Sequence, residues 1–194
     1  ATRDVPPECL RSLARAVEAY RTLVSLCPDD SAAVFNTGQL LYETGDYEGA
    51  AYAFRHYTTL EPRDPEGYMR LAFPLEDGGD LAGEAQAYRQ GLLLAPNYVD
   101  AIVDLALIRE QMRNCAAGMN GYRKALALQP NNVRGMGGLG RILGKMNRFD
   151  EALRTFRTAL KMYPAEAFLW VDLGHLFEEG GDLKQALGAF QEAT

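Results

Sequence analysis

The sequence predicts an all-α fold, a right-handed solenoid of five helix-turn-helix units preceded by half a unit. The first observation behind this prediction is that prolines recur at one constant interval, at Pro28, Pro62, Pro96, Pro130 and Pro164. A fixed period of this kind indicates a repeat architecture. The second is the spacing of apolar residues within each half unit, which follows the helical period of three and four residues rather than the strand period of two.

Units of the same length as this proline interval, counted from residue 31, bring two further kinds of residue into register. Position 8 is always small, with Gly38, Ala72, Ala106, Gly140 and Gly174. Position 24 is always aromatic, with Phe54, Tyr88, Tyr122, Phe156 and Phe190. The small residue lets the second helix of a unit lie close to the first, and the aromatic ring fills the space between units. Because no helix pair buries its apolar face alone, stability must come from the stacking of neighbours.

Each unit carries the start and stop residues of two helices. Position 16 holds a helix-capping residue in four units, at Asp46, Asp80, Asn114 and Asp182, and a glycine precedes it at Gly45, Gly79 and Gly181. Unit four has Arg148 instead, so Asn147 or Asp150 is expected to cap its second helix. We expect one helix over about 7–26, then pairs near 31–44 and 47–61 that recur in every later unit, about eleven helices in all.

This period and pattern resemble the tetratricopeptide repeat family, whose motif reads W-x2-L-G-x2-Y, then A-x3-F, then A and P. The last unit matches it most closely, with "WVDLGHLF" from Trp170 and "ALGAF" from Ala186. The resemblance covers residues 31–194 fully and 1–30 as the second half of a unit. It implies a single array over 1–194, with a half unit over 1–30 and full units near 31–64, 65–98, 99–132, 133–166 and 167–194.

The resemblance also implies that first helices line a concave groove, through positions 2, 5, 9, 12 and 13 of each unit. On this register an apolar track consists of Phe35, Met69, Phe73, Val103 and Leu107. The polar groove candidates are Asn36, Gln39, Arg70, Asp104, Arg134, Arg141, Lys145, Asp172 and His175. The track suits an apolar or amphipathic segment. The alternative for each apolar residue is packing against the neighbouring unit.

The stretch "GMGGLG" contains Gly135, Gly137 and Gly140 at the spacing of a dinucleotide-binding loop. That loop needs a strand before it, whereas the register places these glycines inside a first helix, so we expect no dinucleotide site. Close packing at position 8 explains Gly140. It does not explain Gly137 and Gly138, since each glycine inside a helix costs about 1 kcal/mol against alanine. Gly137 is expected to open a bare patch in the groove for a ligand, and neutral drift is the alternative.

Charge varies along the chain although the formal net charge is −6. The negative total argues against broad nucleic-acid binding, for which a basic surface is the first expectation. Residues 133–162 are nevertheless basic, and the register puts Arg134, Arg141 and Lys145 on the concave side. These three could meet a ligand that spans units four and five. The alternative is an ordinary solvated face.

No catalytic or metal-binding constellation is apparent. The two histidines, His56 and His175, lie more than three units apart, and no nucleophile has a partner at a suitable spacing. We therefore expect neither enzymatic activity nor a metal or other cofactor. No apolar run reaches the ~20 residues needed to cross a bilayer. Three cysteines without a CxxC pair favour free thiols and a cytoplasmic location, although a removed leader is compatible with a chain that begins without Met.

The resemblance implies a protein-protein interaction module that binds a peptide or protein segment in its groove and acts as a scaffold or adaptor. The carboxylate clamp of chaperone-binding members places lysine at position 5 and asparagine at position 9, a combination that no unit contains. Two alternatives stay open. The chain could be the substrate-recognition region of a larger enzyme, such as a glycosyl- or other transferase. It could also be a self-assembling scaffold, a homo-oligomer joined through an apolar stripe on the last helix, formed by Leu183, Ala186, Leu187 and Phe190.

Overall fold

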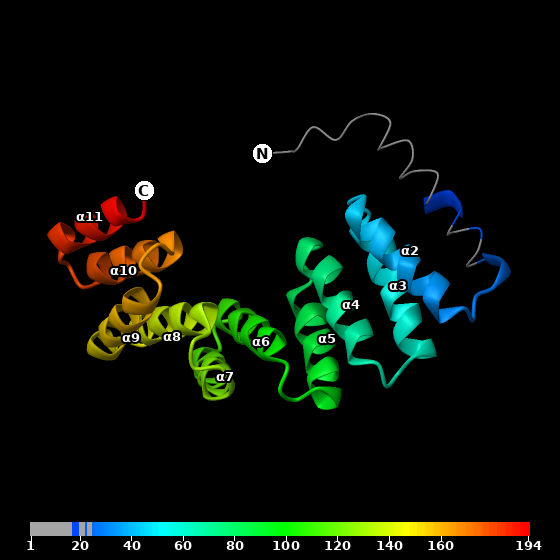
Figure 1. Cartoon of the computed structure of the whole chain (residues 1–194), viewed down its shortest axis with the longest axis horizontal. Coiled ribbons are helices and arrows are strands. Elements are labelled where there is room, and N and C mark those ends of the chain that lie inside the picture. Colours follow the sequence, from blue (N-terminus) through cyan, green and yellow to red (C-terminus); the bar gives the residue numbers. More distant parts are fainter. Residues whose placement is uncertain (1–16, 20–21, 23–24) are drawn as a thin grey trace. The chain divides into compact units, whose positions relative to one another are not determined.

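The computed structural model describes residues 17–19, 22 and 25–194, which contain ten complete α-helices and no strand (Figure 1). The expected helix over 7–26 lies mostly outside these residues. The helices are α2 (Ser31–Glu43), α3 (Tyr47–Leu60), α4 (Pro65–Asp77), α5 (Leu81–Leu94), α6 (Val99–Gln111), α7 (Cys115–Leu128), α8 (Val133–Lys145), α9 (Phe149–Met162), α10 (Ala167–Glu179) and α11 (Leu183–Glu192). The predicted pairs of helices, and their recurrence in each of the five full units, are confirmed.

Side-chain caps fix the start of the second helix in four units. Asp46 accepts a hydrogen bond from the backbone N–H of Gly49 at 2.9 Å, and Asp80 accepts one from Gly83 at the same distance. Asn114 and Asp182 cap α7 and α11 in the same way. These bonds satisfy backbone donors that the first turn of a helix leaves without partners.

The turn before each second helix uses a left-handed residue. Gly45, Gly79 and Gly181 have φ angles of 81°, 76° and 81°, while Arg113 and Asn147 adopt φ 59° at the same place in the other two units. The expectation that Asn147 or Asp150 caps α9 is wrong. Arg148 occupies the cap position without a side-chain cap bond, because Asn147 is needed in the turn and the Arg148 guanidinium instead binds both carboxylate oxygens of Glu151 at 2.7 Å.

The described residues fall into two compact units, one that ends at Pro96 and one from Asn97 to Thr194. In the first, α2 packs with α3 and α4 with α5, and α3 also contacts α4. In the second, the pairs are α6 with α7, α8 with α9 and α10 with α11, and each pair contacts the next. Whether the two units continue one single array over 1–194 depends on how they join, so the single array stays a prediction.

Packing inside each pair follows the predicted roles of positions 8 and 24. A Cβ on Gly38 would lie 3.0 Å from the Phe54 ring, and one on Gly140 would lie 2.7 Å from the Phe156 ring. Any larger residue at these two positions would displace the ring. Phe54 and Phe156 are at most 2% exposed, so the close approach of the helices also buries two of the largest side chains of the core.

Candidate functional site

Three first helices, α6, α8 and α10, form the candidate site in the second compact unit, where α8 packs against both of the others. Their side chains, together with Tyr122 of α7 and Phe156 of α9, line two adjacent cavities. The first, about 260 Å³, is lined by Val103, Leu107, Tyr122, Arg134, Arg141 and Phe168. The second, about 270 Å³, is lined by Arg141, Gly144, Lys145, Phe156, Asp172, His175, Leu176 and Glu179. Because Arg141 lines both cavities, we treat them as one site and call it the α8 groove.

A buried carboxylate lies beneath the α8 groove. Glu110 of α6 is 4% exposed, and it accepts hydrogen bonds from Arg141 Nε at 2.8 Å, Arg141 Nη2 at 3.0 Å and Lys145 Nζ at 2.8 Å. The hydroxyl of Tyr122 on α7 donates to it as well, at 3.0 Å. Arg141 also donates through Nη1 to Asp172 of α10 at 3.1 Å. One network therefore fixes Arg141 and Lys145, two of the three cations of α8, and joins four helices.

The network remains ionic at neutral pH. Burial alone would raise the pKa of Glu110, but the hydrogen bonds and charges of Arg141 and Lys145 outweigh burial and hold this pKa below its ordinary value. Burial raises the pKa of Asp172, and Arg141 offsets the rise only in part. Burial also raises the pKa of Tyr122, and the neighbouring Glu110 charge adds to the rise, so the hydroxyl keeps its proton. Tyr122 and both cations therefore act as donors toward a charged Glu110.

Gly138 makes room for the hydrogen bond of Tyr122 to Glu110. The ring of Tyr122 occupies the place that a Cβ on residue 138 would take. Only glycine on α8 allows that ring to pass and its hydroxyl to reach α6. Gly138 therefore lowers the helix propensity of α8, but it allows Tyr122 to join the buried network around Glu110.

Gly137 has a different neighbour. A Cβ on Gly137 would lie 2.8 Å from Cε2 of Phe168 and 3.2 Å from Cδ2 of Leu169, both on α10. The expected bare patch at Gly137 is wrong, because the Phe168 ring covers the glycine and buries it. The groove therefore presents Phe168, which is 37% exposed, where the sequence register suggested an open backbone.

The candidate residues in the second compact unit lie on the three first helices of the groove. They are Val103, Asp104, Leu107, Arg134, Gly137, Arg141, Lys145, Asp172 and His175. Val103 is only 2% exposed and belongs to the wall of the first cavity, whereas Leu107 is half-buried there. His175 is exposed at the second cavity, 3.3 Å from Glu178, with its ring edge-on to Phe190.

Candidates in the first compact unit are mostly engaged within it. Met69 is 4% exposed and packs at Gly91 of α5, so it presents almost no surface to a ligand. Phe35 packs edge-on against the rings of Phe54 and Tyr57, with centroids 5.6 and 4.9 Å away. Met69 is therefore packed inside the repeats, whereas Phe35 is only half-buried and its place in the groove stays a prediction.

The other three polar candidates and Phe73 lie on α2 and α4. Arg70 forms an ion pair with Glu66 at 2.6 Å, and Phe73 lies beside Tyr42 with ring centroids 6.3 Å apart. Asn36 and Gln39 are exposed on α2. None of these four residues lines the cavity that lies between α2 and α3 of the first unit.

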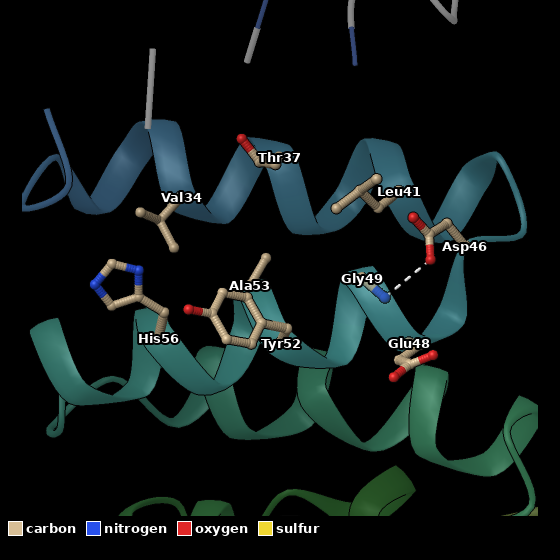
Figure 2. Close-up of a pocket in the computed structure, with 9 residues that line it drawn as sticks. All are labelled: Val34, Thr37, Leu41, Asp46, Glu48, Gly49, Tyr52, Ala53 and His56. Atoms are coloured by element: carbon tan, nitrogen blue, oxygen red, sulfur yellow. Dashed lines mark hydrogen bonds between the residues drawn. The ribbon is translucent and has the colours of Figure 1, made fainter. Parts of the chain in front are cut away.

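The first unit has its own cavity, of about 460 Å³, between α2 and α3 (Figure 2). Val34 and Leu41 border it from α2, and Tyr52 and His56 border it from α3. Asp46 lies at its edge, but its carboxylate already caps α3 through Gly49. The sequence register did not single out this place, because its α2 residues fall outside the positions assigned to the groove.

Three residues that matter in the α8 groove were not among the candidates. Glu110 is at position 12 and Phe168 is at position 2, and the family register assigns both positions to the groove. The register alone could therefore have identified these two residues. Tyr122, at position 24, was assigned only to packing between units. Its second role depends on Gly138, which belongs to a different helix of the next unit.

Metal and membrane features can be checked in the described part of the chain. Nowhere in residues 17–19, 22 and 25–194 do three or more His, Cys, Asp or Glu side chains gather at distances suited to a metal ion. Within the same residues, no helix has both the length and the apolar character that a bilayer crossing requires. Cys27 and Cys115 are free thiols, and Cys9 lies outside the described residues.

Comparison with a family model decides the classification. The model described as tetratricopeptide repeat matches residues 10–65 and 138–194, more than half of the chain. The chain belongs to the tetratricopeptide repeat family. The resemblance drawn from the motif is thereby confirmed. A search of curated protein sequences finds no match.

Solved structures of tetratricopeptide repeat (TPR) proteins share the fold. One from Parabacteroides merdae is 17% identical with a TM-score of 0.84, covering 93% of this chain and 72% of that chain. MamA from Desulfovibrio magneticus is 20% identical with a TM-score of 0.76, covering 84% and 93%. YrrB, described as a TPR protein with an unusual peptide-binding site, is 16% identical with a TM-score of 0.72, covering 91% of each chain. The predicted all-α solenoid fold is confirmed.

Proposed function

We propose that this TPR protein is an interaction module that binds a peptide or protein segment in the α8 groove and serves as a scaffold or adaptor. The observation that carries the proposal is the pair of adjacent cavities on α6, α8 and α10, with Arg141 held between them. The peptide-binding site that the description of YrrB mentions supports this assignment, since YrrB has the same fold.

The chemistry of the α8 groove suits a segment of polypeptide. Leu107 and Phe168 supply apolar surface, while Arg134, Arg141 and Lys145 supply hydrogen-bond donors. Arg141 is fixed by Glu110 and Asp172 before any ligand arrives. A fixed side chain loses little conformational entropy on binding, so such contacts contribute more to affinity than mobile ones.

A peptide library tests this function. Random dodecapeptides displayed on phage are selected on the purified chain, and the enriched peptides are then synthesised for fluorescence polarisation. Phe168→Ala is expected to weaken binding at least tenfold, because an exposed aromatic residue in a pocket is the usual anchor of such a contact. The matched control is Met162→Ala on α9, which is similarly exposed but lines neither cavity. Equal affinity for the folded Phe168→Ala variant would exclude the α8 groove.

Self-association is a second candidate, favoured by two exposed leucines on α11. Leu183 and Leu187 lie one helical turn apart and are 68% and 60% exposed. The other members of the predicted stripe are packed inside the last pair: Ala186 is 3% exposed and the ring of Phe190 lies against Gly174. We expect mass measured by light scattering to rise with concentration, and Leu183→Glu with Leu187→Glu to abolish the rise. A monomer over the whole range would exclude this candidate.

A further inference from the structure

The three cations of α8 lie above the carboxylates with which they pair. The Arg134 side chain is 51% exposed and its partner Asp104 is 20% exposed. The Lys145 side chain is 47% exposed, whereas the side chain of Glu110 beneath it is 2% exposed. Arg141 follows the same order, at 32% against 16% for Asp172. A ligand in the α8 groove therefore meets the positive partner of each pair first.

Charge is distributed unequally between the two cavities. The first is lined by two arginines, Arg134 and Arg141, and by no carboxylate, and its other walls are the apolar or aromatic residues Leu107, Phe168 and their neighbours. The second is lined by Arg141 and Lys145 together with Asp172 and Glu179, so its charges balance. Selection by charge should therefore arise mainly at the first cavity.

The size of the first cavity limits what can enter it. About 260 Å³ is below the range of roughly 300–1,000 Å³ typical of sites for whole small molecules. A cavity of this volume, with Leu107 and Phe168 in its wall, has room for one large apolar side chain. A carboxylate next to that side chain could approach Arg134 at the cavity wall, because the Arg134 side chain is more exposed than Asp104, the acid with which it pairs, and Coulomb attraction is strongest for the nearest charge.

We infer that the α8 groove selects an acidic segment of a partner protein in which one large apolar side chain, seated in the first cavity, is flanked by aspartate or glutamate. This inference rests on the proposed function, because it names the class of segment that the groove binds. Charge complementarity carries it: the exposed Arg134 and the half-buried Arg141 line a cavity that also has apolar and aromatic walls and no acidic lining residue.

The selection experiment is refined to test this class of segment. The random dodecapeptides are displayed between Gly/Ser flanks, so that no free carboxyl terminus is available, and are selected on the full chain. We expect enriched sequences to carry Asp or Glu within two positions of Phe, Leu, Ile or Trp. Binding of the amidated synthetic peptide should weaken several-fold as NaCl is raised from about 50 to about 300 mM, because salt screens contacts between exposed charges.

Two substitutions of one residue separate charge from structure. Arg134→Gln is expected to weaken binding roughly three- to fivefold, the effect of one partly exposed ion pair, while Arg134→Lys keeps the charge and most of the affinity. The matched control, Arg154→Gln on the exposed part of α9, should bind like the unaltered chain. Circular dichroism melting curves confirm that each variant is folded.

The outcomes separate this inference from the proposed function. Selected peptides that need Phe168 but are neutral or basic, or that bind Arg134→Gln with unchanged affinity, overturn the inference and leave the function standing. The absence of any peptide sensitive to Phe168→Ala overturns both. A dimer of the chain alone that dissociates in Arg134→Gln would identify a second copy as the occupant, and would also overturn the inference.

Discussion

Two glycines that lie inside helices of this chain, Gly138 of α8 and Gly188 of α11, have opposite structural consequences. At Gly138 a Cβ would run into the Tyr122 ring, whereas at Gly188 of α11 it would meet nothing within 4 Å. Alanine favours a helix by about 1 kcal/mol over glycine at either position. The two sites therefore allow the packing effect to be measured against a common propensity gain.

We expect Gly138→Ala to lower the free energy of unfolding by about 1–3 kcal/mol, because overpacking displaces the Tyr122 ring from Glu110. Gly188→Ala is expected to raise it by about 0.5–1 kcal/mol. Urea unfolding followed by circular dichroism measures both. A stabilised Gly138→Ala variant would show that Tyr122 can move without loss, contrary to the role given to Gly138.

Glu110 makes the stability of the chain depend on pH. Its folded-state pKa is lowered, so it contributes stability that is present above its unfolded pKa of about 4.3 and is lost as pH falls through the folded value. Glu110→Gln should cost about 1–3 kcal/mol at pH 7, because the half-buried Arg141 and the partly exposed Lys145 lose the counter-charge that they share. We expect the difference between the two proteins to shrink below about pH 4, as followed by urea unfolding at several pH values. A difference independent of pH would mean that the Glu110 charge is not what stabilises the network.

At the scale of helices, local chemistry determines where most elements begin. The caps at Asp46, Asp80, Asn114 and Asp182 could be predicted because each needs only a residue three positions further on. The start of α9 could not be predicted in this way. Asn147 could serve either as the cap of α9 or as the left-handed residue of the preceding turn, and in the structure it is the turn residue. Glu110 and Tyr122 were harder still, since their contacts join residues 12 to 35 positions apart.

Removal of a cap should have a local and measurable cost. Asp80→Ala is expected to lower the free energy of unfolding by about 1 kcal/mol, because the N–H of Gly83 loses its acceptor. Arg148→Ala is the matched control at the same position of unit four, where no side-chain cap exists. It should change stability by less than about 0.5 kcal/mol through its partly exposed pair with Glu151. Equal losses in the two variants would contradict the assignment of the cap.

At the scale of the whole molecule, the compact unit 97–194 contains three complete helix pairs and every residue of the α8 groove. Because repeats are stabilised by their nearest neighbours, three pairs are enough for an independent fold. We expect a fragment of residues 97–194 to unfold cooperatively and to bind the selected peptides within about threefold of the full chain. A fragment that is unfolded by circular dichroism would show that this unit depends on the other.

The contacts of Glu110 have a consequence for how binding preference can change. Arg141 and Lys145 both present charge to the groove and hold α6 and α8 together. A substitution that alters selectivity at either residue therefore also alters the stability of the fold. Arg134 also joins α8 to α6, through Asp104, but both of these side chains keep some contact with solvent, so this pair contributes less to stability. New ligand preferences should therefore arise first at Arg134, by single substitutions, whereas changes at Arg141 require a compensating change at Glu110.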